Sequence, residues 1–171
     1  MSTFRLPIMT ATVLPDSTGE CYMDNINNQM SLATGLMRNL VMTFKDPSAD
    51  TGFYGTFQVP QNFSTSGTTK IIIMGVLDGT VGATSVDFEF SYRSLADNDS
   101  VEQGWQDSDQ GNSGNTNGWT NEDLCKIEIT VTSADFAVGD EVFYYLKRDQ
   151  GTDDFVGDFH VVGVYFEYED S

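Results

Sequence analysis

The sequence predicts an all-β protein, an antiparallel β-sandwich of the jelly-roll kind with seven or eight strands. The first observation is a period of two in hydrophobicity, clearest at 83–92, where Val86, Phe88 and Phe90 alternate with polar residues. The second is the enrichment of these runs in β-branched and aromatic residues. The third is that turns rich in Gly, Asp and Asn separate the runs, with no long helical period between them.

Residues 1–35 are predicted to form an extended arm that lies on a partner. Pro7 interrupts the apolar residues of this stretch, and no core periodicity connects them. The candidate partner-binding residues are Phe4, Leu6, Ile8, Met9, Val13 and Leu14. The alternative is that the stretch supplies a first strand and loops to the same domain.

Residues 36–171 are predicted to form the sandwich domain. The run 36–44 indicates a strand that ends at Lys-Asp-Pro, although a spacing of four also permits a short helix. Strands are expected next at 53–59, at 69–77, which is apolar almost throughout, and at 83–92.

Three further strands are expected near the C-terminus, at 125–132, 140–148 and 158–169. The last run is apolar on both parities, with Val162 and Val164 on one and Phe159 and Val161 on the other. Such a strand should be covered on both sides, either within the sandwich or beneath a neighbouring subunit.

A long polar loop is predicted at about 93–124. It is dominated by Asp, Asn, Ser, Gly and Gln, and Trp105 and Trp119 are its large apolar residues. A connection of this length is usually functional or flexible. Together with Tyr92, the two tryptophans are candidates for stacking on sugar rings; the alternative is that each tryptophan anchors the loop to the sandwich.

The charge balance restricts the partners. The 171 residues contain 26 Asp and Glu against 8 Lys and Arg, a formal net charge of −18. Such a surface repels phosphate backbones and anionic lipids, and no apolar run is long enough to span a bilayer, so neither nucleic acid nor membrane is expected as a partner.

Cys21 and Cys125 lie too far apart in the sequence to indicate a disulfide framework. No signal peptide is evident at the N-terminus, which predicts synthesis in the cytoplasm.

The residue types argue against an enzyme or a cofactor. His160 is the only histidine, so neither a catalytic triad nor a zinc site is indicated. Weak candidates for a cation site are the closely spaced carboxylates Asp149, Asp153, Asp154 and Asp158. The alternative is a hairpin turn in which Arg148 pairs with a nearby aspartate.

The segments 137–149 and 154–168 resemble the C-terminal halves of β-sandwich virion proteins from tailed bacteriophages. In each segment Gly-Asp opens a strand; Arg-Asp ends the first strand and an aromatic-acidic pair closes the second. The resemblance implies a capsid decoration, or cement, protein at the virion surface. Its partners would be the major capsid protein and, in a homotrimer, itself. The alternative is a glycan-binding module of a phage tail or fibre.

Overall fold

The computed structural model describes residues 2–9, 14–15, 21–25, 40–46, 49–79, 84–115, 119 and 123–171. This part of the chain contains eleven β-strands and one 3₁₀ turn, η1 (Ser133–Asp135), and no α-helix. The all-β prediction is confirmed, with more strands than the seven or eight expected. Within the described residues, no helix has the length and hydropathy needed to cross a membrane.

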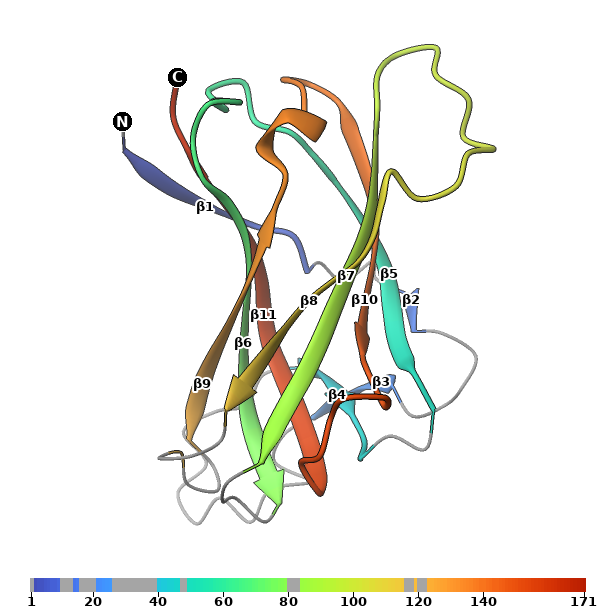
Figure 1. Cartoon of the computed structure of the whole chain (residues 1–171), viewed down its shortest axis with the longest axis vertical. Coiled ribbons are helices and arrows are strands. Elements are labelled where there is room, and N and C mark those ends of the chain that lie inside the picture. The colour runs from blue at the N-terminus through green and yellow to red at the C-terminus, as the bar shows by residue number, and fades with distance from the viewer. Residues whose placement is uncertain are drawn as a thin grey trace.

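The strands form two antiparallel sheets that face each other (Figure 1). The six-stranded sheet has the order β3-β4-β11-β6-β9. Strand β1 also belongs to it: β4 pairs with the first part of β11, and β1 pairs with the last part of β11 along the same edge. Its strands are β1 (Thr3–Pro7), β3 (Cys21–Asn25), β4 (Leu40–Phe44), β6 (Thr69–Gly79), β9 (Leu124–Val131) and β11 (Gly157–Glu169).

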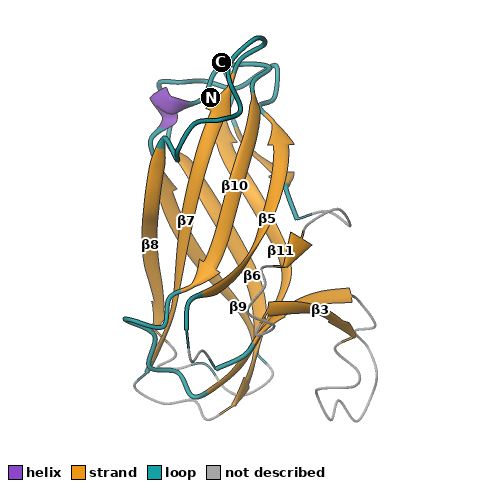
Figure 2. Ribbon diagram, turned by 90° about the vertical axis from the view of Figure 1, so that its right-hand side faces the viewer, coloured by secondary structure: helices purple, strands orange, loops and turns teal. Residues whose placement is uncertain are grey.

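The five-stranded sheet has the order β2-β5-β10-β7-β8, and Figure 2 shows its outer face. Its strands are β2 (Leu14–Pro15), β5 (Thr51–Gln58), β7 (Ser85–Leu95), β8 (Asp107–Asn115) and β10 (Glu141–Arg148). Six of the predicted strands coincide with β5, β6, β7, β9, β10 and β11. The described part of the run 36–44 is strand β4, as predicted, and residues 36–39 lie outside the described residues.

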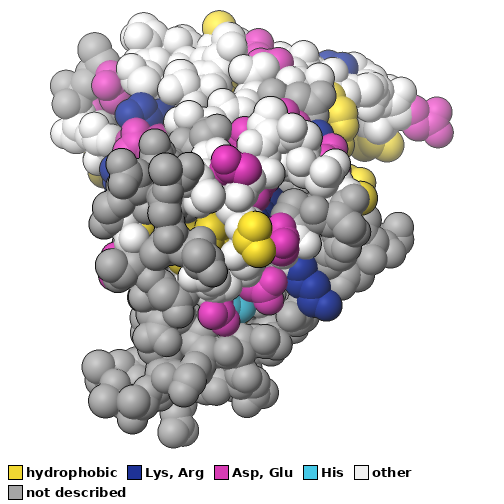
Figure 3. Space-filling model, turned by 60° about the horizontal axis from the view of Figure 1, so that its bottom comes forward, with side chains coloured by type: hydrophobic (Ala, Val, Ile, Leu, Met, Phe, Trp, Pro, Cys, Tyr) yellow, Lys and Arg dark blue, Asp and Glu magenta, His cyan; other side chains and the backbone are white. Residues whose placement is uncertain are grey.

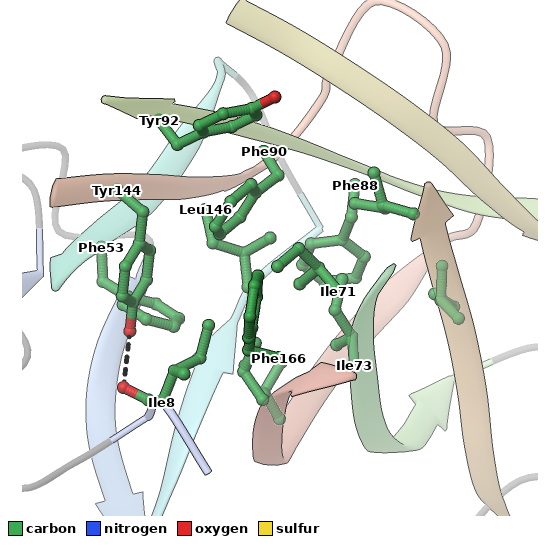
Figure 4. Close-up of a cluster of buried hydrophobic side chains, with 14 of the residues drawn as sticks. Ile8, Phe53, Ile71, Ile73, Phe88, Phe90, Tyr92, Tyr144, Leu146 and Phe166 are labelled. Carbon is green, nitrogen blue, oxygen red and sulfur yellow. Dashed lines mark hydrogen bonds between the residues drawn. The ribbon is translucent and has the colours of Figure 1, made fainter. Parts of the chain in front are cut away.

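The core lies between the sheets and is rich in aromatic rings (Figure 4). The alternation predicted for β7 is confirmed, because Val86, Phe88 and Phe90 are buried. Rings from the two sheets meet directly, as in the edge-on contact of Phe88 with Phe159 at 5.2 Å between centroids. Aromatic pairs with this geometry stabilise a core beyond the area that they bury.

A β-bulge explains why the last strand is apolar on both parities. The register between β11 and β6 shifts between Val161 and Gly163, so Val162 has no partner in the ladder. Phe159 and Val161 point to the core before the shift, and Val164 and Phe166 do so after it. One extra residue therefore moves the apolar set to the other parity. The sequence suggested that both faces of this strand are covered, but the bulge explains the apolar residues on both parities without such cover.

The N-terminal segment differs from the expected arm. Strand β1 pairs with β11 over five residues, and Ile8 is fully buried and accepts a hydrogen bond from Tyr144 Oη at 2.9 Å (Figure 4). Leu6 and Met9 pack against the core, and Phe4 stacks on Tyr168. These residues therefore belong to the sandwich, because pairing with β11 satisfies the backbone of β1. The backbone of Leu14 lies in β2, beside β5, and Val13 lies outside the described residues.

The segment 93–124 also differs from the predicted loop. Its low-complexity part forms the edge strand β8, which pairs with β7 from Ser85↔Asn115 to Tyr92↔Asp107. Main-chain hydrogen bonds to an existing strand override the weak intrinsic preference of Asp, Asn and Gly for this conformation. The remaining loop before β8 is residues 96–106.

The outer face of the six-stranded sheet carries ion pairs. Glu128 of β9 accepts hydrogen bonds from Lys126 and from Lys70 of β6, the latter at 2.7 Å. These bonds, led by that from Lys126, lower the pKa of Glu128 from an ordinary value of 4.5 to about 2. The neighbouring strands add the pair of Arg5 with Glu167.

The Glu128 cluster should make stability depend on acid pH. A carboxyl group whose pKa is lower in the folded state stabilises the fold above its unfolded pKa and loses that contribution as pH falls. Between about pH 4.5 and 2 the wild type should therefore lose more thermal stability than Glu128→Gln, by a modest amount because the site is partly exposed. Thermal unfolding at stepped pH values checks this, with Glu102→Gln as control. Parallel curves for wild type and Glu128→Gln would contradict it.

Candidate functional site

The outer face of the five-stranded sheet bears exposed aromatic side chains. On β10, Tyr144 and Leu146 fill the core, so Phe143 and Tyr145 project from the other side of the sheet. Phe143 is 38% exposed and Tyr145 is half-buried. Aromatic rings on the solvent side of a strand do not contribute to the core, so another role must be sought for them.

Strand β5 adds a second tyrosine to this face. Tyr54 lies directly opposite Tyr145 in the antiparallel register. The two rings stack with their centroids 4.5 Å apart and their planes inclined by 25°. Tyr54 remains 47% exposed, so the pair offers a rigid, amphipathic platform to solvent.

The β7–β8 loop brings Trp105 to the same face. The loop extends beyond the end of β7 and returns to β8 (Figure 1). Arg93 Nε donates to the carbonyl oxygen of Gly104 at 2.8 Å, and the amide of Gln106 donates to the Tyr92 carbonyl at 2.8 Å. Trp105 is thereby held 41% exposed beside Phe143. We call Tyr54, Tyr145, Phe143 and Trp105 the aromatic face.

An open groove of about 240 Å³ lies at the Trp105 end of the aromatic face. Its lining comes from β7, β10 and the β7–β8 loop. The residues are Arg93, Leu95, Val101, Gln103, Gly104, Trp105 and Phe143. Mostly apolar walls with few polar groups are typical of ligand sites in proteins.

Charged residues border the other end of the aromatic face. Lys147, which follows Tyr145 on the same side of β10, donates to Glu89 at 2.7 Å and to Asp50 at 2.9 Å. Burial alone would lower the pKa of Lys147, but these two hydrogen bonds outweigh it and raise that pKa. The lysine is thus charged and paired within the protein.

The three predicted sugar-stacking residues do not gather at one place. Tyr92 is fully buried, and its hydroxyl donates to Asp135 at 2.8 Å; burial and this carboxylate raise the pKa of Tyr92. Trp119 is half-buried and packs on the core near Gly114, at the opposite end of β8 from Trp105. Trp119 thus anchors the chain to the sandwich, which was the alternative reading.

Sequence reasoning missed Tyr54, Phe143 and Tyr145. The run 141–148 is apolar on both parities, and nothing in it tells which parity faces the core. The available signal was that aromatic residues are adjacent in each of these strands. Because successive side chains point to opposite faces of a strand, one residue of each adjacent pair must face away from the core.

Three of the four predicted cation-site carboxylates are hydrogen-bonded within the chain. Asp153 forms a two-point pair with Arg148, at 2.8 Å for each contact, as the hairpin reading expected. Asp154 accepts from the Ser85 hydroxyl at 3.1 Å, and Asp149 from the Thr152 hydroxyl at 2.7 Å. Asp158 lies opposite Asp78 in the ladder. Among the described residues, no group of three His, Cys, Asp or Glu side chains could hold a metal ion.

His160 is buried on the six-stranded sheet, away from the aromatic face. Its Nδ1 lies 2.9 Å from the Thr43 hydroxyl, and its Nε2 lies 3.7 Å from a carboxylate oxygen of Asp78. The lower end of the molecule carries mainly acidic side chains among its described charged residues (Figure 3). Among the described residues, Nε2 of His160 has no hydrogen-bond partner.

Comparison with known proteins places the fold. No family model and no curated protein matches the sequence. Among solved structures, the CBM22-1 xylan-binding domain of Paenibacillus barcinonensis Xyn10C has 10% identity and a TM-score of 0.50, with 98% of this chain and 94% of that chain covered. This likeness is in the fold and confirms a sandwich shared with carbohydrate-binding modules.

Two other solved structures are similar at a lower score. The K1 cleaved adhesin domain of Lys-gingipain from Porphyromonas gingivalis W83 has 10% identity, 99% coverage of both chains and a TM-score of 0.49. An arabinose-bound GH51 α-L-arabinofuranosidase has 14% identity and a TM-score of 0.48, with 95% of this chain covered. This chain spans 24% of the length of that enzyme.

Proposed function

We propose that this protein is a carbohydrate-binding β-sandwich without catalytic activity, whose aromatic face is its sugar-binding surface. The observation that carries the proposal is the exposure of Trp105, Phe143, Tyr145 and Tyr54 on one side of one sheet. This corresponds to the glycan-binding alternative drawn from the sequence, with a different set of residues.

Stacking on sugar rings would make use of these side chains. A pyranose ring presents C–H groups on its faces and hydroxyl groups around its edge. Aromatic rings complement the faces, because their π-systems are apolar and carry negative charge density toward a C–H group. Lys147, Glu89 and Arg93 border the same surface and can bond to the hydroxyl edge.

The charge of the protein favours a neutral glycan. The chain has a formal net charge of −18, which repels uronic acids, sulfates and phosphates at long range. On the aromatic face, Lys147 already pairs with two carboxylates. The described residues of this face therefore lack the excess of positive charge that an anionic polysaccharide requires.

The fold supports this class of ligand by analogy. The CBM22-1 domain that shares the fold is described as xylan-binding. The alternative is capsid decoration by a homotrimer at the virion surface, with the major capsid protein as its partner. No contact among the described residues favours that alternative over sugar binding.

Substitutions on the aromatic face test the proposal. Phe143→Ala and Tyr145→Ala should each weaken binding to a neutral polysaccharide about tenfold or more, as expected when a central aromatic contact is lost. Calorimetry against a panel of xylan, β-glucan, mannan and galactan measures this. Phe4→Ala is the matched control, since Phe4 is 41% exposed on the other sheet, and it should bind like the wild type. A wild type that binds nothing in the panel, or equal losses in all three variants, would refute the proposal.

A further inference from the structure

The groove beside Trp105 differs in chemistry from the rest of the aromatic face. Tyr54 and Tyr145 offer flat rings, whereas the groove adds the aliphatic side chains of Leu95 and Val101. Val101 is 74% exposed, although it is a branched apolar residue on a polar loop. Aliphatic groups have no π-face for a sugar ring, and a hydroxyl placed against them would lose its hydrogen bond to water. Their natural complement is a methyl group.

Polar groups stand beside these apolar walls. Arg93 lines the groove, and its Nε is held by the Gly104 carbonyl. A guanidinium has four other N–H donors, which suit a carbonyl oxygen. Gln103 also lines the groove, and its amide nitrogen donates to the Ser100 carbonyl at 2.9 Å. An apolar wall that accommodates a methyl group, next to N–H groups that can donate to a carbonyl oxygen, is complementary to an acyl group.

The β7–β8 loop gives the groove a defined shape. Asp99 accepts a hydrogen bond from the Ala96 amide at 2.9 Å, and the Asp99 amide donates to the Ala96 carbonyl at 3.1 Å. Asn98 takes a positive φ of 70°, which asparagine tolerates in tight turns. A wall formed in advance reduces the entropy that a ligand must offset on binding.

The size of the groove suits a substituent better than a whole ligand. Sites that enclose a small molecule usually measure about 300–1,000 Å³, and this groove has about 240 Å³ and is open toward the sheet. A sugar chain lying along β10 on Phe143 and Tyr145 would place groups of one residue in it.

We infer that the groove binds the acetyl substituent of a neutral polysaccharide, with the methyl on Val101 and Leu95 and the carbonyl oxygen on Arg93. This inference rests on the proposed function and narrows it to acetyl-bearing glycans. The acetyl group can be carried on nitrogen or on oxygen, and the same groove chemistry serves both.

Paired ligands with and without acetyl groups test the inference. Triacetylchitotriose and cellotriose share a β-1,4-linked backbone of the same sugar configuration and differ at C2 of each residue, where the first carries an acetamido group and the second a hydroxyl. Acetylated xylan and the same xylan after alkaline deacetylation form the second pair. At least one pair should show about tenfold tighter binding of the acetylated member, the low end for one methyl-sized group in an apolar pocket. The pair that responds identifies acetyl on nitrogen or on oxygen.

Val101→Ser assigns the preference to the groove. This exposed loop variant should keep the affinity for the unsubstituted glycan and reduce the acetyl preference to about threefold or less. Val156→Ser is the matched control, because Val156 is 65% exposed on the β10–β11 loop and should leave the preference unchanged.

The outcomes separate this inference from the proposed function. Equal binding within both pairs overturns the acetyl inference and leaves sugar binding standing. No binding of any of the four ligands overturns the acetyl inference, and the proposed function falls with it only if the wild type also binds nothing in the wider panel of neutral polysaccharides. A concentration-dependent dimer in sedimentation that Val101→Ser abolishes would assign the groove to a second copy of the chain and also overturn the inference.

Discussion

Replacing Arg148 by methionine should lower the free energy of unfolding by about 3–5 kcal/mol, the cost of breaking a buried ion pair from one side. Arg148 is fully buried at the end of β10. Its guanidinium pairs with Asp153 through two contacts of 2.8 Å and donates to the carbonyls of Phe155 and Gly157 at 2.7 Å and of Lys45 at 2.8 Å. One side chain thus ties together β10, the β10–β11 turn and the chain after β4.

Urea unfolding of Arg148→Met measures this loss. Lys126→Met serves as the control, since it removes a partly exposed cation and should cost less than about 1 kcal/mol. The double variant Arg148→Met/Asp153→Leu should recover part of the loss, because it removes the uncompensated buried carboxylate as well. A loss below 1 kcal/mol in the single variant would show that water or another donor replaces the arginine.

Truncating Phe166 to alanine should destabilise the fold by about 3–5 kcal/mol, as for other large aromatic residues in cores. Phe166 of β11 is fully buried, with its ring centroid 4.9 Å from that of Phe57 in β5 and 5.2 Å from that of Phe136. Its ring therefore joins the two sheets, and alanine would leave a cavity between them.

Phe143→Ala is the matched comparison for stability. Phe143 is also a phenylalanine within a strand, but it faces solvent, so its loss should change stability by less than about 1 kcal/mol. Phe166→Ala should thus lower the free energy of unfolding, whereas Phe143→Ala should weaken sugar binding. Equal destabilisation by the two variants would mean that Phe143 supports the fold, which would weaken the case for the aromatic face.

The fold class could be predicted from the sequence because period-two hydrophobicity is a local property. The alternation of Val86, Phe88 and Phe90 requires one wet and one dry face whatever the strand pairs with. Two features escaped that reasoning, besides the pairing of β1 with β11. The bulge at Val162 changes parity within one strand, and β8 is a strand because β7 offers it a hydrogen-bonding edge.

The candidate site was less predictable than the fold. Of the three residues predicted to stack on sugar rings, Trp105 is exposed, whereas Tyr92 and Trp119 pack against the interior. The sequence does not show whether an aromatic residue in a strand points to the core or to solvent. Only the partners of the strand decide which ring is buried.

The sequence by itself determined that this chain is a sandwich of antiparallel strands with an acidic surface, since both follow from residue order and composition. The tertiary structure decided that residues 2–9 complete a sheet and that Tyr54, Phe143 and Trp105, far apart in the chain, share one surface. The physical reason is that sheet register and loop position arise from long-range pairing, which local patterns do not encode.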